Sequence, residues 1–156
     1  MGREYFGGKA RRKQILGAKL DRATADMPQG AASAIFNILN GKVLITTIVG
    51  EVTVAIGGAN ATKLVANPTL STAADTDLCA TTDINTCDIG DLLGITGTPG
   101  DNLLVAHKGS IQAMLTGGVI LQTGTLDLDC AGSVTGKIKW LITYIPLDDG
   151  AEVTVA

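Results

Sequence analysis

The sequence predicts an all-β protein: an antiparallel β-sandwich or a jelly-roll-like β-barrel, preceded by an extended or partly helical N-terminal arm. Three observations predict this fold class. After about residue 27, short runs of Val, Ile, Leu and Thr are separated by turns that use most of the 20 glycines. Residues 125–130 and 137–145 alternate strictly between apolar and polar side chains, which is the pattern of half-buried strands. No convincing helical pattern follows residue 27, and many short strands with regular turns are typical of sandwiches and barrels.

Charge divides the chain into two parts. Residues 1–26 hold seven basic and three acidic side chains, a net charge of +4, whereas residues 27–156 hold five basic and twelve acidic ones, a net charge of −7. We therefore assign residues 1–29 to a basic N-terminal arm with its linker, and residues 30–156 to one β-sandwich or barrel domain. A mean hydropathy of +0.31 and a charged fraction of only 17% exclude a disordered chain.

The arm combines aromatic, basic and aliphatic side chains. Its tip carries Tyr5 and Phe6, the two aromatic residues that precede the body. Residues 9–22 contain good helix formers with one weakly apolar face, so we predict a short helix that is ordered only when it lies on a partner surface. Residues 23–32, with one Pro and one Gly, are predicted to be the linker into the body.

The first half of the body is predicted to contain short strands that end at glycines. Asn40-Gly41 favours a type I′ hairpin turn. Gly50 is predicted to separate two strands, and Gly57-Gly58 to form a further break. The strands expected here cover residues 34–39, 42–49, 51–56, 62–66 and 76–81.

The second half is predicted to contain further strands around a clear turn cluster at Gly97-Thr98-Pro99-Gly100. The strands expected here cover residues 92–96, 103–106, 110–115, 119–122, 125–130, 137–145 and 152–155. The segment between residues 130 and 137 suits an antiparallel turn, and pairing of the flanking strands would place Asp127 and Asp129 within reach of Lys137 and Lys139.

No catalytic motif is present, and we predict that the protein is not an enzyme and needs no cofactor. The chain has only one histidine, His107, which excludes most metal and acid–base sites that need several. His107 itself is expected on the surface. There is no GxSxG nucleophile elbow, and no glycine-rich phosphate loop has the required spacing. Cys79, Cys87 and Cys130 are expected to be reduced, buried side chains, although a Cys79–Cys87 bridge across a hairpin is the alternative.

Acidic residues gather between residues 75 and 91. Asp83, Asn85, Asp88 and Gly90 resemble part of a calcium loop, but their spacing does not fit an EF-hand. Because Asp and Asn also form ordinary turns, we favour solvated turns over a calcium site and predict no metal. The acidic residues concerned are Asp75, Asp77, Asp83, Asp88 and Asp91.

The basic arm is predicted to bind another protein. Nucleic acid is the less favoured partner because the acidic body offers no basic face, and a merely solvated tail is the other alternative. No membrane contact is expected, because the longest apolar run, residues 43–49, is too short to span a bilayer. The residues expected to contact the partner are Tyr5, Phe6, Arg11, Arg12, Lys13 and Leu16.

Two segments give the chain a family resemblance. Residues 25–56 (ADMPQGAASAIFNILNGKVLITTIVGEVTVAI) and 124–151 (GTLDLDCAGSVTGKIKWLITYIPLDDGA) resemble the virion structural proteins of tailed bacteriophages, most of all capsid decoration (cement) proteins. The resemblance implies a β-sandwich or barrel, a homo-oligomer with a trimer favoured, and a place on the capsid surface of a virion. It also implies that the arm clamps neighbouring subunits of the major capsid protein. No functional positions carry over, because the likeness involves no diagnostic set of residues.

Two other functions stay open at this point. One is a phage tail or fibre component, such as a receptor-binding tip, which would be present in few copies per particle. The other is a small carbohydrate- or calcium-binding β-module, whose folded state a ligand would stabilise.

Overall fold

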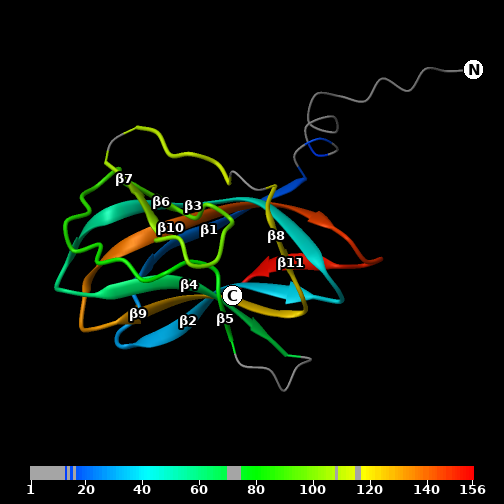
Figure 1. The fold of residues 1–156 in the computed structure, drawn as a ribbon, viewed down its shortest axis with the longest axis horizontal. Helices are drawn as coiled ribbons and strands as arrows, with labels where there is room; N and C mark the ends of the chain where they lie inside the picture. The colour runs from blue at the N-terminus through cyan, green and yellow to red at the C-terminus, as the bar shows by residue number, and fades with distance from the viewer. Residues whose placement is uncertain (1–12, 14, 16, 70–74, 108, 115–116) are drawn as a thin grey trace, which may run out of the picture.

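The computed structural model describes residues 13, 15, 17–69, 75–107, 109–114 and 117–156, and it confirms the predicted all-β fold class (Figure 1). Its strands, in chain order, are β1 (Ala18–Asp26), β2 (Ala31–Leu39), β3 (Val43–Gly57), β4 (Ala61–Pro68), β5 (Thr76–Asp77), β6 (Leu92–Gly94), β7 (Leu104–Ala106), β8 (Val119–Leu121), β9 (Gly124–Ala131), β10 (Thr135–Pro146) and β11 (Glu152–Val155).

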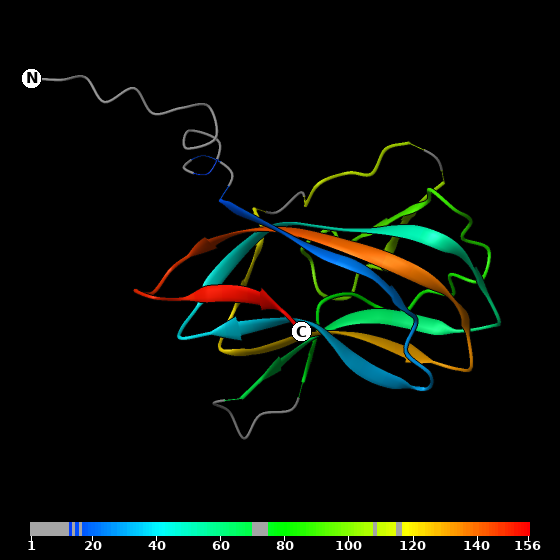
Figure 2. The same cartoon turned by 180° about the vertical axis from the view of Figure 1, so that it is seen from behind.

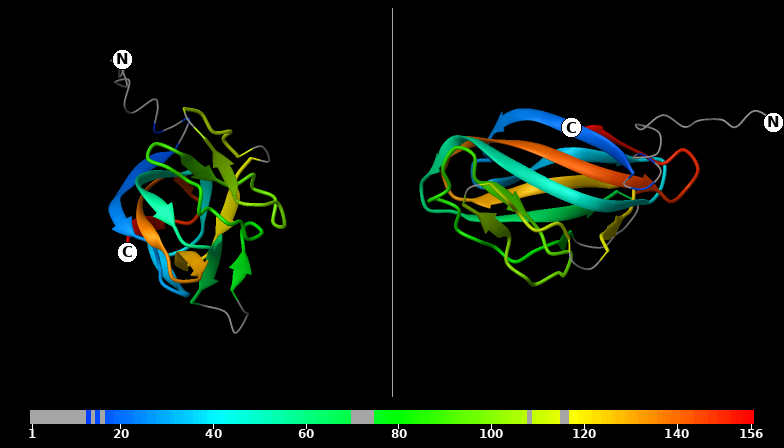
Figure 3. Two further views of the ribbon diagram at one scale, coloured as in Figure 1. Left: turned by 90° about the vertical axis from the view of Figure 1, so that its left-hand side faces the viewer. Right: turned by 90° about the horizontal axis from the view of Figure 1, so that it is seen from above.

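These strands form two antiparallel sheets that pack as a β-sandwich. Sheet A has the order β1-β10-β3-β6-β7, and β8 also pairs with β3. Sheet B has the order β11-β2-β9-β4-β5. Figure 3 shows the two layers end-on and from above. Along one side, isolated bridges at Thr62–Thr82 and Ala80–Asn102 link the segment after β5 to β4 and to the segment before β7. Along the other side the edge strands β1 and β11 lie side by side (Figure 2).

The core lies between the sheets and follows the alternation predicted for β10. Ile138, Trp140 and Ile142 point inward from β10 and are almost fully buried. From sheet B, Phe36 and Leu126 are buried in the same hydrophobic cluster. Trp140 and Phe36 are the two largest fully buried side chains, so branched aliphatic groups fill the remaining volume, as the low aromatic content predicts.

Gly50 does not separate two strands, because β3 runs without a break from Val43 to Gly57. The glycine instead makes room for a large neighbour. A Cβ atom at Gly50 would lie 2.9 Å from Cζ3 and Cη2 of Trp140, which faces Gly50 across the β3–β10 ladder. The expectation of a strand break was therefore wrong, since this glycine serves packing and not a turn.

Asn40-Gly41 forms a turn, but it does not close a hairpin. Asn40 has a φ of 60° and Gly41 a φ of 141°, and the strands that they connect belong to different sheets. β2 pairs with β9 and β11, whereas β3 pairs with β10, β6 and β8. The local sequence correctly predicted a turn, but strand pairing depends on partners far away in the chain.

The predicted hairpin between residues 125–130 and 137–145 is wrong for the same reason. Both strands exist, but β9 lies in sheet B and β10 in sheet A. Asp129 is 3.9 Å from Lys63 of β4, and Lys137 is 3.2 Å from Asp26 of β1, so the charges that were expected to pair with each other have other partners. Lys139 lies 4.0 Å from Glu51 of β3.

The segment expected to end the arm helix and begin the linker is in fact a strand. β1 pairs along β10 at the edge of sheet A, with a bulge between Arg22 and Ala25. Leu20 packs against the core, and Arg22 is half-buried, so burial lowers the pKa of its guanidinium. Alternate inward side chains in residues 18–22 were the signal for this strand, which the basic composition obscured.

The predicted strands at residues 76–81 and 110–115 also differ from the structure. Of residues 76–81, only Thr76 and Asp77 form a strand, β5, beside β4. Leu78 N–H still donates to Leu64 O of β4 (2.9 Å), but Ala80 N–H donates to Asp101 O (2.7 Å), so the chain leaves β4 there. The described residues of the predicted strand 110–115, which end at residue 114, lie outside any strand.

Candidate functional site

Exposed apolar side chains gather at one end of the sandwich, where the chain enters β1. The β2–β3 turn, the β10–β11 turn, β8 and the start of β1 lie together there (Figures 1 and 3). We call this region the arm end. Its large exposed side chains, with their exposed fractions, are Ile15 (74%), Ile120 (61%), Leu147 (45%) and Leu39 (37%). These are most of the large exposed hydrophobic residues that the described part of the chain contains.

Hydrogen bonds hold the turns of the arm end in place. Lys42 donates its backbone N–H to Oδ2 of Asp148 (2.8 Å), and its Nζ lies 3.1 Å from the same oxygen. These hydrogen bonds, the backbone one most strongly, lower the pKa of Asp148. Gly41 N–H donates to Oγ1 of Thr123 (2.9 Å), and Thr69 N–H donates to Thr123 O (3.0 Å). Leu39 and Leu147, which adjoin these turns, are therefore held in fixed positions.

The arm joins the body at Gly17, where the backbone packs too closely against β10 for a side chain. Gly17 has a φ of +86°, and a Cβ atom there would collide with the backbone carbonyl of Tyr144. Gly17 N–H donates to Lys13 O (3.0 Å), which is a helical hydrogen bond, and both Lys13 and Ile15 are helical and exposed. From here on, "the arm" means residues 1–16.

Of the residues expected to contact a partner, the structure describes one. Lys13 lies at the arm end and is exposed. The others lie outside the described residues: Tyr5, Phe6, Arg11, Arg12 and Leu16. The apolar residues of the body at this end, Leu39, Ile120 and Leu147, were not predicted, because they belong to three separate segments that come together only in the folded protein.

A cavity of about 160 Å³ opens beside β8. Leu78 and Leu121, both buried, belong to its lining together with the exposed Ile120 of the arm end. Strands β4, β5 and β9 of sheet B supply most of the rest: Ala66, Asn67, Pro68, Thr76 and Thr125, joined by Gln122. No sequence signal marked this cavity, because its walls come from both sheets.

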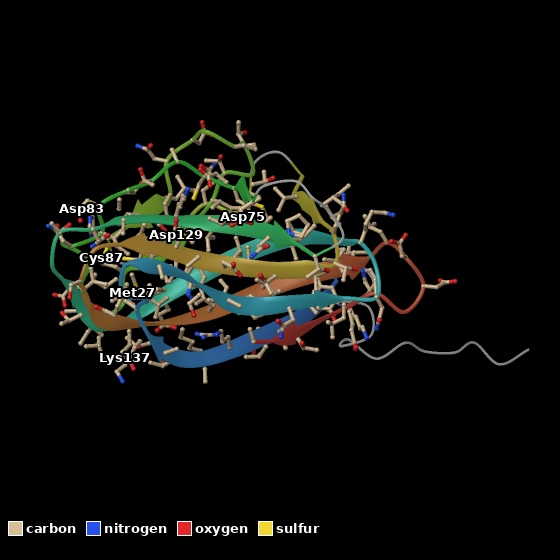
Figure 4. The ribbon with its side chains drawn as sticks, turned by 90° about the horizontal axis from the view of Figure 1, so that it is seen from below. Met27, Asp75, Asp83, Cys87, Asp129 and Lys137 are labelled. Carbon is tan, nitrogen blue, oxygen red and sulfur yellow. The ribbon has the colours of Figure 1, made fainter. Side chains whose placement is uncertain are left out.

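Carboxylates lie on the outer face of sheet B next to the cavity. Asp127 is only 5% exposed; its Oδ2 accepts a hydrogen bond from Asn67 (3.4 Å), and its Oδ1 has no hydrogen-bond partner. Lys63 lies 2.7 Å from Asp77 and 3.9 Å from Asp129, and the hydrogen bond with Asp77 raises the pKa of Lys63. Figure 4 labels Asp75 and Asp129; Asp129 lies opposite Lys63, toward the end of β4 and β9 that is farther from the cavity.

The acidic turn at residues 83–91 lies at the opposite end of the sandwich, where Figure 4 labels Asp83 and Cys87. Its carboxylates cap backbone groups: Asp83 accepts from Asn85 N–H (3.0 Å), and buried Asp91 accepts from Asp88 N–H (2.9 Å). Asp91 also lies 2.8 Å from Nδ1 of His107, whose ring is exposed as predicted. No group of three or more His, Cys, Asp and Glu residues is arranged to hold a metal ion in the described part of the chain.

The three cysteines are buried and free, which confirms the interpretation as small core side chains and not the Cys79–Cys87 bridge. Burial, assisted by Asp91 and Asp83, raises the pKa of Cys87 to about 11. Burial also raises the pKa of Cys79. Thiols held in this way are protonated at neutral pH and are poor nucleophiles.

Comparisons with known proteins show no family. No family model matches the chain, and no curated protein matches it. One solved structure that it resembles is described as "Structure of infectious bursal disease virus Gx strain", with a TM-score of 0.24 and 11% identity. That match covers 87% of this chain and spans about a third, 33%, of the other chain. A TM-score of this size carries no argument about fold or function. Among the described residues, no helix is long and apolar enough to cross a membrane.

Proposed function

We propose that this protein is a structural component of a viral shell, a capsid decoration (cement) protein that docks through its arm end. The observation that carries the proposal is the grouping of exposed apolar side chains around the exit of a cationic arm, at one end of an acidic body. The arm contributes basic side chains and the fixed turns contribute apolar ones, so the two together suit a protein surface that is both apolar and acidic.

The apolar residues of the arm end explain why a partner is needed. Scattered exposed hydrophobic residues are normal on a soluble protein, but a group at one end usually marks an interaction site. Ile120 lies in β8 and Leu147 follows β10, the two strands that flank β3 at this end of sheet A. Covering each such side chain contributes about 1.5–3 kcal/mol when burial is complete.

The resemblance to phage decoration proteins supports the choice of partner, which would be the major capsid protein. A homo-oligomer, most simply a trimer, presents several arm ends at once. Once one arm end is bound, the others bind at a high effective concentration, so the attachment is much stronger than a single contact. Rupture of the shell must then also break these added contacts.

Deleting residues 1–12 tests the role of the arm. This truncation keeps Gly17 and all of β1, whereas a longer deletion into residues 18–22 would remove part of an edge strand and confuse unfolding with lost docking. We expect the truncated chain to fold with an unchanged circular dichroism spectrum but to lose co-sedimentation with shells prepared from the same source without this protein. Full occupancy of those shells by the truncated chain would contradict the proposal.

A matched pair of substitutions tests the arm end itself. Leu147→Ser removes an exposed apolar side chain at the arm end, and Ile89→Ser removes a more exposed one (69%) in the turn at the opposite end. We expect the first to weaken shell binding at least tenfold and the second to leave it unchanged. Equal effects of the two variants would show that the arm end is not the docking surface.

A further inference from the structure

We infer that the cavity beside β8 receives the side chain of Phe6 from the arm of a second copy of this chain. This inference rests on the proposed function in one respect, namely that the arm is a docking segment. It goes further by assigning the tip of the arm to a specific site between copies, so that the arm links the subunits of the decoration oligomer to each other.

The cavity has the size and lining of an aromatic-ring site. An apolar cavity of about 150 Å³ in a protein binds a benzene molecule. The cavity here measures about 160 Å³ and is lined by Leu78, Leu121, Ala66, Pro68 and Ile120 together with four polar residues. The side chain of Phe is a benzene ring on one methylene group, so one such side chain matches this volume.

The arm is the part of the chain that has aromatic side chains to offer. The sequence contains one Trp, two Tyr and two Phe. Trp140 and Phe36 are buried in the core, and Tyr144 is packed against it from β10. The remaining two, Tyr5 and Phe6, are adjacent in the arm. Phe6 suits a mainly apolar lining better, because a buried Tyr hydroxyl needs a hydrogen-bond partner.

Charge complementarity favours the same occupant. Thr76 of the lining lies between Asp75 and Asp77 in the chain, and Asn67 of the lining binds Asp127. Three carboxylates, those of Asp75, Asp77 and Asp127, therefore adjoin the lining, and Lys63 forms an ion pair with Asp77. In the arm, Lys9 follows Phe6 by three residues, and two arginines come next. Three residues of extended chain span about 10 Å, so a seated ring would place these cations over the acidic margin.

The buried carboxylate of Asp127 is a second, independent sign of a missing partner. Its Oδ1 has no hydrogen-bond partner although the residue is only 5% exposed. A buried oxygen without a donor is costly, and such groups in native proteins normally have a partner. A cationic segment passing beside Asn67 would supply favourable charge where the described residues supply none.

The course of the chain favours a second copy over the same copy. Lys13 and Ile15, the two described residues of the arm, are both exposed, Ile15 by 74%, so this part of the arm is not packed against the body of its own subunit. The cavity and the arm exit are different patches of one subunit, so each copy both gives a tip and receives one. Head-to-tail contacts of this kind close into a ring, such as a trimer, when the rotation between neighbouring copies permits it.

Photo-crosslinking of the full chain tests the inference. Phe6 is replaced by p-benzoylphenylalanine, and heavy-isotope and light chains are mixed before irradiation. We expect crosslinks between a heavy and a light chain, mapped by mass spectrometry to peptides that contain Ala66 or Ile120. The same photoreactive residue at position 15 is the matched control and should not label the cavity. Crosslinks within one chain, or crosslinks to other surfaces, would overturn the inference.

Filling the cavity provides the second measurement. Ala66→Leu adds a larger apolar group to the lining, so it should lower the crosslinking yield at least tenfold without lowering the melting temperature, whereas Ala66→Ser should retain the yield. Thr125→Leu, from β9, fills the same cavity if the first variant folds poorly. An undiminished yield in a folded, filled variant would also overturn the inference.

The experiment uses purified protein without shells, so it fails or succeeds independently of the proposed function. Absent crosslinks together with normal shell binding would remove only the inference about the cavity. Strong crosslinks between copies without any shell binding would support the inference and remove the capsid role.

Discussion

Replacing Gly50 by alanine would place a methyl group against the largest side chain of the core. The new Cβ would lie 2.9 Å from Cζ3 and Cη2 of Trp140 and 3.1 Å from Cγ2 of Ile138. Carbon atoms in contact are separated by about 3.5–4.0 Å, so the indole ring must move. Trp140 is only 1% exposed and is enclosed by packed neighbours, which leaves it little room to do so.

The magnitude follows from two opposing terms. An alanine in a strand is ordinarily more stable than a glycine by about 0.5–1 kcal/mol, because the unfolded chain loses less entropy. Gly50 is not among the glycines with positive φ, so alanine suffers no backbone strain here. Overpacking of a well-filled core costs about 1–3 kcal/mol. We therefore expect Gly50→Ala to lower the free energy of unfolding by about 1–2 kcal/mol.

Urea unfolding followed by the fluorescence of Trp140, the single tryptophan of the chain, measures this effect. The midpoint should fall while the slope m stays constant, because the fold is the same. Gly57→Ala in the same strand is the control: its new Cβ would meet only Oγ1 of Thr135 (2.9 Å), and a side-chain atom of that kind can rotate away. A Gly50→Ala variant as stable as the wild type would refute the packing argument.

The remaining predictions concern two carboxylates. Hydrogen bonds from Lys42 hold the pKa of Asp148 below its usual value in the folded state, so their stabilisation is present above the unfolded pKa and is lost as the pH falls through the folded pKa. The fall in melting temperature between pH 6 and pH 3 should therefore be smaller in Asp148→Asn than in the wild type; an equal fall would contradict this. In the chain that lacks residues 1–12, and so has no arm tip to compensate this carboxylate, Asp127→Asn removes a buried carboxylate oxygen without a partner, while the new amide oxygen still accepts from Asn67. We therefore expect a gain of about 1 kcal/mol by urea unfolding. A loss of stability in this variant would show that the charge is compensated.

The strands with clear alternation could be predicted from the sequence. Residues 137–145 place Ile138, Trp140 and Ile142 on one face, and the structure buries that face. The period of side chains along a strand is a local property, so the sequence shows it directly. The strand at residues 18–26 was missed because its inward-facing residues include a basic side chain, Arg22, as well as Leu20. The basic composition led us to assign this segment to the arm.

Strand partners could not be predicted from the same patterns. Asn40-Gly41 and the segment after Cys130 both have the composition of hairpin turns, yet each carries the chain from one sheet to the other. A turn limits how the chain reverses, but it does not determine which edge the next strand meets. The edge that a strand pairs with depends on how both sheets bury their apolar faces against each other. This involves residues more than a hundred positions apart, such as Gln29, whose Nε2 donates to Val134 O (2.6 Å).

The candidate site, too, could be predicted from the sequence only in part. The cationic arm with Tyr5 and Phe6 is evident from composition, because charge and aromaticity are properties of the residues themselves. The apolar arm end and the cavity beside β8 are not, because their side chains come from separate turns and from both sheets.

By itself, the amino-acid sequence determined the all-β class, the inward face of the long strands and the contrast between a basic leader and an acidic body. Only the tertiary structure decided which strands share a sheet, that Gly50 leaves room for the ring of Trp140, and that Ile120 and Leu147 lie at the same end of the sandwich. The physical reason is range: side-chain alternation and charge act between near neighbours in the chain, whereas packing and sheet pairing join residues that are adjacent only after folding.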